Sequence, residues 1–199
     1  MNSRALGLLV AIFVFALIAS ADPVNVITVG PGSTLIGFAT ISSTFTLPSV
    51  SGVMNEWVVS DTTNPYYSSA LDFIFQVTDS TGSLQEFAMT SCCFDLFNAG
   101  ITSGYGVAGT ETPSSIIGVT GLDGTSGPGF IFGSGMTVGT SVDLIIQTDT
   151  SYLDTAFFQV DGVTKGFAWG PLPEPKYIGL VLGGFFALGL LLMRQFRTQ

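Results

Sequence analysis

The sequence of 199 residues has no histidine and very few basic side chains. Without histidine it lacks the commonest general base and the commonest protein ligand for transition metals. Five lysines and arginines stand against fourteen aspartates and glutamates. Between Asp22 and Gly170, thirteen acids face a single base, Lys165, which leaves a net charge of −12 over that range. Nucleic acid and anionic lipid are therefore not expected as partners, because an acidic surface repels both.

Cysteine is also rare, with Cys92 and Cys93 as the only two. Neighbouring residues of a strand point to opposite faces, which blocks an ordinary disulfide between them. Three states remain open: unpaired or partly buried thiols, a strained vicinal disulfide in a turn, and a bridge to another molecule. Because no histidine can activate it, a catalytic cysteine of the papain type is excluded.

The N-terminal end of the chain is apolar. Arg4 precedes the apolar residues 5–18, and Ala19-Ser20-Ala21 then provides the small-x-small pattern of a signal-peptidase site. We therefore predict a helical signal peptide over residues 1–21, with Asp22 as the first residue of the mature chain.

A second apolar run lies near the C-terminus, over residues 177–193. It is apolar on every side and spans about 25 Å as a helix, near the lower limit for crossing a bilayer. It predicts a single transmembrane helix. Arg194 and Arg197 place the basic end, residues 194–199, on the cytoplasmic side. Residues 171–176 before the run form a proline-rich linker that cannot continue a helix.

The tail resembles a known bacterial sorting signal. Pro173-Glu174-Pro175, the apolar span and the basic end together resemble the PEP-CTERM signal over about residues 172–197, although the basic end has two separated arginines in place of a dense cluster. The resemblance implies recognition by an exosortase, which cuts near Pro173–Pro175 after transient anchoring in the inner membrane. It also implies a bacterium that makes exopolysaccharide, and delivery to the cell surface or the extracellular matrix.

Between the two ends the chain has the pattern of short strands. The clearest is 71–78, where apolar side chains alternate with more polar ones such as Asp72 and Gln76. This alternation predicts one face in the core and one face exposed to water. The turn residues 79–83 and the return over 84–90 predict a hairpin.

The same pattern continues along the body. Asp161-Gly162 predicts a second hairpin, between strands 155–160 and 163–169. Further strands are expected at 24–29, 35–41, 45–47, 56–60, 92–97, 116–119, 129–132 and 142–148. No window of residues 22–170 shows a sustained helical period. We predict one all-β domain there, an all-antiparallel β-sandwich with jelly-roll or immunoglobulin-like wiring, although the sequence does not separate a sandwich from a barrel.

A match to the dinucleotide-binding pattern G-x-G-x-x-G occurs at Gly104-Tyr-Gly-Val-Ala-Gly109. No clean strand precedes it, and Pro113 interrupts the chain soon after it. Since no helix N-terminus would receive a pyrophosphate, we interpret the match as a glycine-rich loop and expect no dinucleotide cofactor.

Carboxylates at predicted strand ends are candidates for binding a ligand. Loops at one end of a sandwich could bring two or three of them around calcium, which takes oxygen ligands. None has EF-hand or nonapeptide spacing, and aspartate is also a common turn residue, so no metal site is assigned. A pair of carboxylates could instead serve glycoside hydrolysis, but the sequence favours no particular pair. The candidates for calcium are Asp79, Asp123, Asp149, Asp154 and Asp161.

Aromatic residues could form a face that stacks on sugars. The candidates are Trp57, Tyr66, Tyr67, Tyr105, Tyr152 and Trp169. Most aromatic side chains are expected in the core, and the pair Tyr66-Tyr67 beside Asn64-Pro65 is expected to be exposed. Our favoured hypothesis is a non-enzymatic, exported envelope or matrix protein that acts by adhesion or by association with exopolysaccharide. The alternative is an exported carbohydrate hydrolase that uses two carboxylates.

Overall fold

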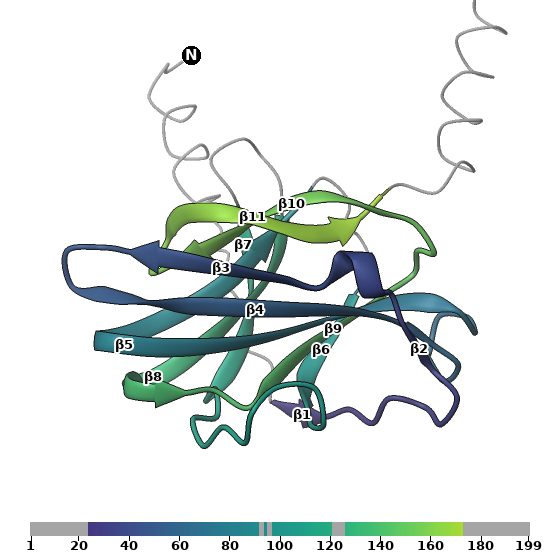
Figure 1. The fold of residues 1–199 in the computed structure, drawn as a ribbon, viewed down its shortest axis with the longest axis horizontal. Helices are drawn as coiled ribbons and strands as arrows, with labels where there is room; N and C mark the ends of the chain where they lie inside the picture. The colour runs from purple at the N-terminus through teal and green to yellow at the C-terminus, as the bar shows by residue number, and fades with distance from the viewer. Residues whose placement is uncertain (1–23, 92–93, 95–96, 121–125, 173–199) are drawn as a thin grey trace, which may run out of the picture.

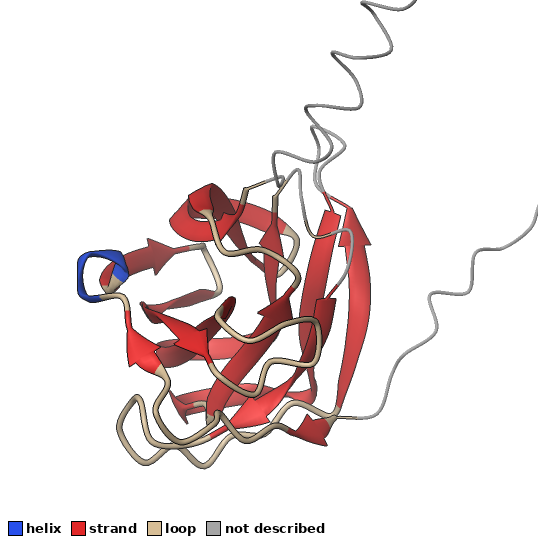
Figure 2. Cartoon of the chain, turned by 90° about the vertical axis from the view of Figure 1, so that its right-hand side faces the viewer, coloured by secondary structure: helices blue, strands red, loops and turns tan. Residues whose placement is uncertain are grey.

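The described part of the chain is built almost wholly of β-strands. The computed structural model describes residues 24–91, 94, 97–120 and 126–172 (Figure 1). Its strands are β1 (Asn25–Val26), β2 (Thr34–Leu35), β3 (Ile41–Thr46), β4 (Val50–Asp61), β5 (Ala70–Thr90), β6 (Phe97–Thr102), β7 (Ser115–Thr120), β8 (Ser126–Thr140), β9 (Asp143–Thr148), β10 (Leu153–Val160) and β11 (Val163–Pro171). The one helical element of these ranges is a 3-10 turn, η1 (Gly37–Ala39) (Figure 2). The prediction of an all-β fold is confirmed.

Several predicted features lie outside the described residues. These are the helices expected in 1–21 and 177–193, the calcium candidate Asp123, and the sorting, cleavage, orientation and cysteine residues Ala19, Ala21, Asp22, Cys92, Cys93, Pro173, Glu174, Pro175, Arg194 and Arg197. Within the described ranges, no helix is long and apolar enough to cross a membrane.

Strand β5 joins two groups of strands. Its first half pairs with β4 at one edge and with β9 at the other, and these continue to β2, β3 and β6. Its second half pairs with β8 and β10, which continue to β7 and β11. The strands therefore form one mixed sheet, in which the neighbouring strands β1-β6-β9-β5-β10-β11 make one continuous path.

The chain changes direction inside β5, at residues 79–83. Thr81 N donates to Asp79 Oδ1 at 2.9 Å, Gly82 has a φ of 99°, and the pairing with β8 skips from Asp79 to Ser83. These are features of a β-bulge, which lets a strand bend without ending. The predicted hairpin between 71–78 and 84–90 is wrong, because the turn residues form a corner within one strand and each half pairs with other strands.

A phenylalanine-rich core lies between the two groups. Phe75 from the first half of β5 packs on Phe87 from the second half. Phe45 on β3 and Phe158 on β10 meet edge to face, with ring centroids 6.5 Å apart. Burying a side chain of this size stabilises the fold by roughly 1.5–3 kcal/mol. The apolar face predicted for 71–78 is therefore confirmed by the contacts it makes.

The opposite face of β5 is buried as well. Asp72 and Gln76, whose positions predicted exposure to water, have exposed fractions of 0% and 1%. The N-terminal segment covers this face, and Ile27 packs there on Ile74 and Ile145 in a second, smaller core. The prediction of a wet face is wrong, because segments from distant parts of the sequence lie over it.

The short strand β1 joins the sheet edge in parallel. It pairs with residues 100–101 of β6, and Ile27 N donates to Ile101 O at 2.8 Å. A second parallel bridge links Glu111 to Ser141. The all-antiparallel arrangement predicted from the sequence is wrong at these two places.

The hairpin between β10 and β11 is confirmed. Val160 pairs with Val163, and Asp161 and Gly162 between them have φ values of 49° and 73°. Two central residues with positive φ are typical of a type I′ turn, which aspartate and glycine adopt readily.

Candidate functional site

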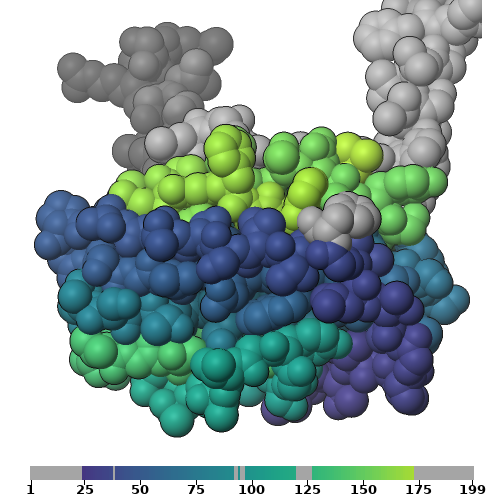
Figure 3. All heavy atoms as spheres, viewed as in Figure 1, coloured from purple at the N-terminus to yellow at the C-terminus, as the bar shows by residue number. Residues whose placement is uncertain are grey.

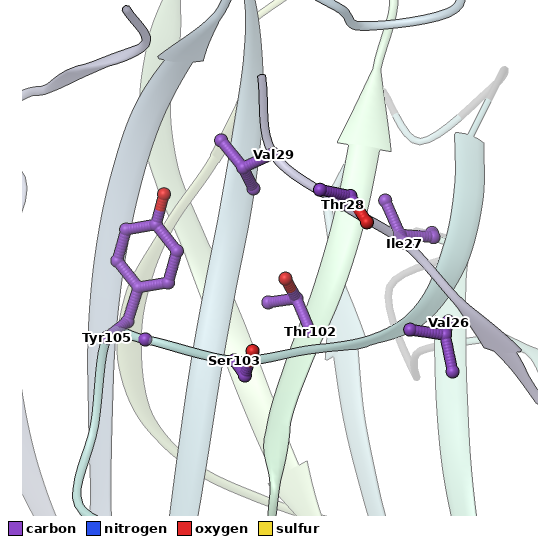
Figure 4. Close-up of a pocket in the computed structure, with 8 residues that line it drawn as sticks. Val26, Ile27, Thr28, Val29, Thr102, Ser103 and Tyr105 are labelled. Carbon is purple, nitrogen blue, oxygen red and sulfur yellow. The ribbon is translucent and has the colours of Figure 1, made fainter. Parts of the chain in front are cut away.

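A hollow of about 330 Å³ lies between the N-terminal segment and the chain that follows β6. In the space-filling view, the purple atoms of the first described residues lie against teal atoms from the middle of the chain (Figure 3). Figure 4 shows the Tyr105 ring at one side of the hollow and the hydroxyls of Thr102 and Ser103 pointing toward the N-terminal segment. The lining combines an aromatic ring, aliphatic side chains and hydroxyls without a charge: Val26, Ile27, Thr28, Val29, Thr102, Ser103, Gly104 and Tyr105.

Tyr105 is held in place by hydrogen bonds between its loop and the sheet. Tyr105 N donates to Asp143 Oδ2 at 3.0 Å, and Gly106 N donates to Asp143 Oδ1 at 3.2 Å. The Gln76 side chain donates to Val107 O at 2.8 Å and accepts from Val107 N at 3.1 Å. Because Asp143 and Gln76 are buried on β9 and β5, the loop is fixed and the Tyr105 ring packs against the second core.

The same loop contains the G-x-G-x-x-G match. Residues 103–109 form bends and irregular loop without a helix, which confirms the interpretation as a glycine-rich loop. A second hollow of about 420 Å³ shares Thr102, Ser103 and Gly104 with the first and reaches Asp143. The loop is therefore flanked by solvent-accessible space over much of its length.

The N-terminal wall of the first hollow is fastened to Asp61, at the end of β4. Gly30 N and Ser33 Oγ each donate to Asp61 Oδ1 at 2.9 Å. Thr63 N donates to the same oxygen, also at 2.9 Å. One carboxylate therefore ties the N-terminal segment to the turn after β4.

Asp61 belongs to a buried polar cluster with Asp72. Gln147 Nε2 donates to Asp61 Oδ2 at 3.4 Å and to Asp72 Oδ2 at 3.3 Å. Asn64 Nδ2 donates to Asp72 Oδ1 at 2.8 Å. Both carboxyl groups lack exposed surface. Two neighbouring negative charges in a buried site repel each other, so one of the two carboxyl groups is expected to hold a proton.

The surroundings of the two acids shift their pKa values in opposite directions. Burial raises the pKa of Asp72 from its ordinary 3.8 to about 7, opposed by the hydrogen bond from Asn64 and assisted by nearby Asp61. Burial also acts to raise the pKa of Asp61, but hydrogen bonds from Thr63, Gly30 and Ser33 outweigh it and hold that pKa below 3.8. Asp61 is therefore the ionised member of the pair at neutral pH.

The charge of these acids reaches the hollow. Burial raises the pKa of the Tyr105 hydroxyl above its ordinary 10.0, and Asp72, Asp61 and Asp143 raise it further, in that order. A phenol whose ionisation is opposed by three separate carboxyl groups lies in a negative electrostatic field.

The aromatic pair predicted for sugar stacking lies elsewhere. Tyr66 and Tyr67 are in the turn between β4 and β5, where both are half-buried, and Tyr66 N donates to Asn64 Oδ1 at 2.9 Å. Burial, with Asp149 as a further cause, raises the pKa of Tyr66. Neither tyrosine lines the two hollows described above, and their role in sugar stacking stays a prediction.

The other predicted aromatic residues are spread over the molecule. Trp57 lies with Tyr105 against the second core, and Trp169 packs against the first. Tyr152 is 51% exposed. The structure therefore does not gather the six candidates into a single face.

The carboxylates considered for calcium are only partly brought together. Asp79 at the β5 corner lies near Asp161 in the β10–β11 turn. Burial raises the pKa of Asp79, and the charge of Asp161 raises it further. Asp149 lies near Tyr66, and Asp154 is exposed on β10. No group of three acids or cysteines suited to a metal occurs among the residues that the structure describes. Calcium binding stays an untested prediction.

Sequence reasoning named Tyr105 among six aromatic candidates but missed the hydroxyls beside it. Thr28, Thr102 and Ser103 meet only because β1 pairs with β6. The one signal in the sequence was the tyrosine itself, placed between two glycines of a loop.

Comparisons with known proteins give no relative for this chain. No protein-family model, no curated protein and no solved structure matches it. The function is therefore argued from the residues themselves.

Proposed function

We propose that the chain is an exported, non-enzymatic protein of the cell envelope or extracellular matrix that associates with exopolysaccharide. The signal peptide predicted over residues 1–21 and the tail that resembles a PEP-CTERM signal support export. Signal peptidase and an exosortase are the processing partners. The inner membrane holds the tail until it is cut near Pro173–Pro175, and the mature domain then reaches the cell surface or the matrix.

The observation that supports polysaccharide binding is the hollow beside Tyr105. Sugars present an apolar face and many hydroxyls, so an aromatic ring next to side-chain hydroxyls suits both parts. Its volume of about 330 Å³ is within the range usual for small-ligand sites. Thr28 and Ser103 are exposed at its rim, which suits a site that binds part of a long polymer.

The binding function is tested with the full-length protein, purified in detergent, on an array of bacterial polysaccharides. Tyr105→Ala removes the ring, and Ser103→Phe fills the hollow from an exposed position. Each should weaken binding at least about tenfold. Tyr152→Ala changes an exposed tyrosine outside the hollow and should bind like the wild type. Equal binding by all four proteins, or no binding by the wild type, would refute the proposal.

The same preparations separate binding from hydrolysis. Asp61 and Asp72, the pair of acids behind the hollow, are hydrogen-bonded and have no exposed surface, which favours a binding protein over a carbohydrate hydrolase. New reducing ends in the incubated polysaccharide, lost on replacement of one Asp or Glu, would overturn the non-enzymatic proposal. Processing is tested in the native host by mass spectrometry, where an intact Gln199 in the mature protein would contradict removal of the tail.

We also propose that the two strand groups are the layers of a β-sandwich with jelly-roll or immunoglobulin-like wiring. The contacts of Phe75 with Phe87 and of Phe45 with Phe158 across the core support this arrangement. An experimental structure of the protein would test it, and strands that close into a continuous barrel would contradict it.

A further inference from the structure

The hollow beside Tyr105 has a buried carboxylate behind each of its two walls. Asp61 Oδ1 accepts from Gly30 N at 2.9 Å, directly after the lining residue Val29. Asp143 Oδ2 accepts from Tyr105 N at 3.0 Å on the opposite wall. Asp61 and Asp143 have exposed fractions of 0% and 4%. A charge in such surroundings is screened less than one in water, so both act on the space between the walls.

No nearby cation offsets this negative field within the described ranges. Lys165 is the only basic residue that they contain, and it lies on β11. Strand β11 is at the opposite end of the strand path from β1 and β6, which carry the hollow. Lys165 Nζ donates there to Thr46 O at 3.1 Å. The lining of the hollow is itself uncharged, so the carboxylates behind it determine the sign of its potential: Asp61 and Asp143, joined by Asp72 where the pH is high enough to ionise it.

We infer that the hollow selects glycans that carry free, protonated amino groups, over neutral or uronic-acid glycans. The inference rests on the proposed polysaccharide binding and names its ligand class. An ammonium group on the sugar is attracted by the field of Asp61 and Asp143 and by the face of the Tyr105 ring. The hydroxyls of Thr102 and Ser103 can accept its hydrogen bonds. A uronate is negatively charged, so the same field would repel it.

The test compares three oligosaccharides of equal length on the full-length protein in detergent. The probes are a glucosamine oligomer with free amines, its fully N-acetylated form and a uronic-acid oligomer, measured by calorimetry at mildly acidic pH and low salt. The free-amine form should bind about tenfold more tightly than the acetylated form. The difference should shrink as salt is added, and the uronate should not bind.

Two variants separate the site from the general acidity of the protein. Asp143→Asn removes a charge behind Tyr105 and keeps an oxygen that can accept from Tyr105 N, but its Nδ2 replaces the oxygen that accepts from Gly106 N and Gln76 Nε2. The ratio of the two affinities therefore reports the charge, and this preference for free amines should fall at least about threefold. Asp154→Asn removes an exposed charge on β10 and should leave the preference unchanged.

The outcomes distinguish this inference from the function on which it rests. Equal affinity for the free-amine and acetylated oligomers overturns the inference and leaves polysaccharide binding intact. The same loss of preference in Asp143→Asn and Asp154→Asn also overturns it, because the attraction is then general. Failure of the wild type to bind any of the three oligomers or any polysaccharide of the array overturns both.

Discussion

The rings of Phe75 and Phe87 lie 5.7 Å apart, although both residues belong to strand β5. In a straight strand, which rises about 3.3 Å per residue, they would be about 40 Å apart. The corner at residues 79–83 brings the two halves of β5 back toward each other, with the core between them. The bend of one strand therefore creates the space that the phenylalanines fill.

Gly82→Ala should destabilise the protein by at least about 1 kcal/mol. Gly82 has a φ of 99°, which side chains rarely adopt, and a Cβ there would collide with the carbonyl oxygen of Ser49. The measurement is the free energy of unfolding from urea denaturation. Gly118→Ala is the matched control, because a Cβ on Gly118 of β7 meets nothing within 4 Å. Equal stability of the two variants would show that the corner does not need glycine.

The strands and the corner differ in how far the sequence predicts them. The alternation of residues 71–78 is a property of a few neighbouring residues, and the apolar face that it predicts is confirmed. Whether 79–83 is a hairpin turn or a bulge depends on which strands lie beside it. Asp79 and Gly82 are suited to a hairpin turn and to a bulge alike. The bulge forms because the residues on either side of it pair with β4 and β8.

The candidate site was harder to predict, because it joins residues that are distant in sequence. Residues 98–102 of β6 were not predicted, since Asn98 and Gly100 have low strand propensity, and the strand expected at 92–97 shares only Phe97 with β6. It forms nonetheless, because Asn98 donates to Gln147 Oε1 on β9 at 3.0 Å and Gly100 lets β1 approach. Without β6 the position of the hollow cannot be derived, and Tyr105 does not stand out from the other tyrosines.

Gly100→Ala should detach β1 from the sheet. A Cβ on Gly100 would collide with the carbonyl oxygen of Asn25 and press on the side chain of Ile27. Since Ile27 is buried, its release should cost about 1–3 kcal/mol of stability. Hydrogen exchange is the direct measurement: the Ile27 amide, which donates to Ile101 O, should lose its protection. Gly118→Ala is again the control. Equal protection of the Ile27 amide in Gly100→Ala and Gly118→Ala would contradict the prediction.

Asp161→Ala should cost about 1–3 kcal/mol, whereas Asp161→Asn should cost little. Asp161 has a φ of 49°, which asparagine tolerates far better than alanine. Its Oδ1 also accepts from Gln85 N at 2.8 Å and from Glu86 N at 2.9 Å, and an asparagine oxygen can do the same. Thermal unfolding of the two variants beside the wild type checks this. If alanine were tolerated as well as asparagine, the docking of this turn on β5 would not contribute to stability.

The carboxyl of Asp72 should make the protein less stable as the pH rises toward neutrality. Its pKa is about 7 in the folded protein, against an ordinary value of 3.8. Between these values the folded protein keeps a proton that the unfolded chain has lost, so unfolding releases a proton and the free energy of unfolding falls with increasing pH. The slope from this one group is up to about 1.4 kcal/mol per pH unit, and it vanishes above the folded pKa.

Asp72→Asn isolates that contribution, because Glu56, Asp79 and Glu86 also have pKa values raised by burial and contribute in the same direction. Urea denaturation of wild type and variant across the mildly acidic to neutral range gives the difference in stability at each pH. The free energy of unfolding of the variant should increase relative to that of the wild type as the pH rises, because asparagine remains neutral and can still accept from Asn64 Nδ2. Asp154→Asn, on the exposed side of β10, should run parallel to the wild type. Parallel curves for Asp72→Asn as well would mean that Asp72 titrates alike in the folded and unfolded chains, and that Asp61 and Asp72 do not share a proton.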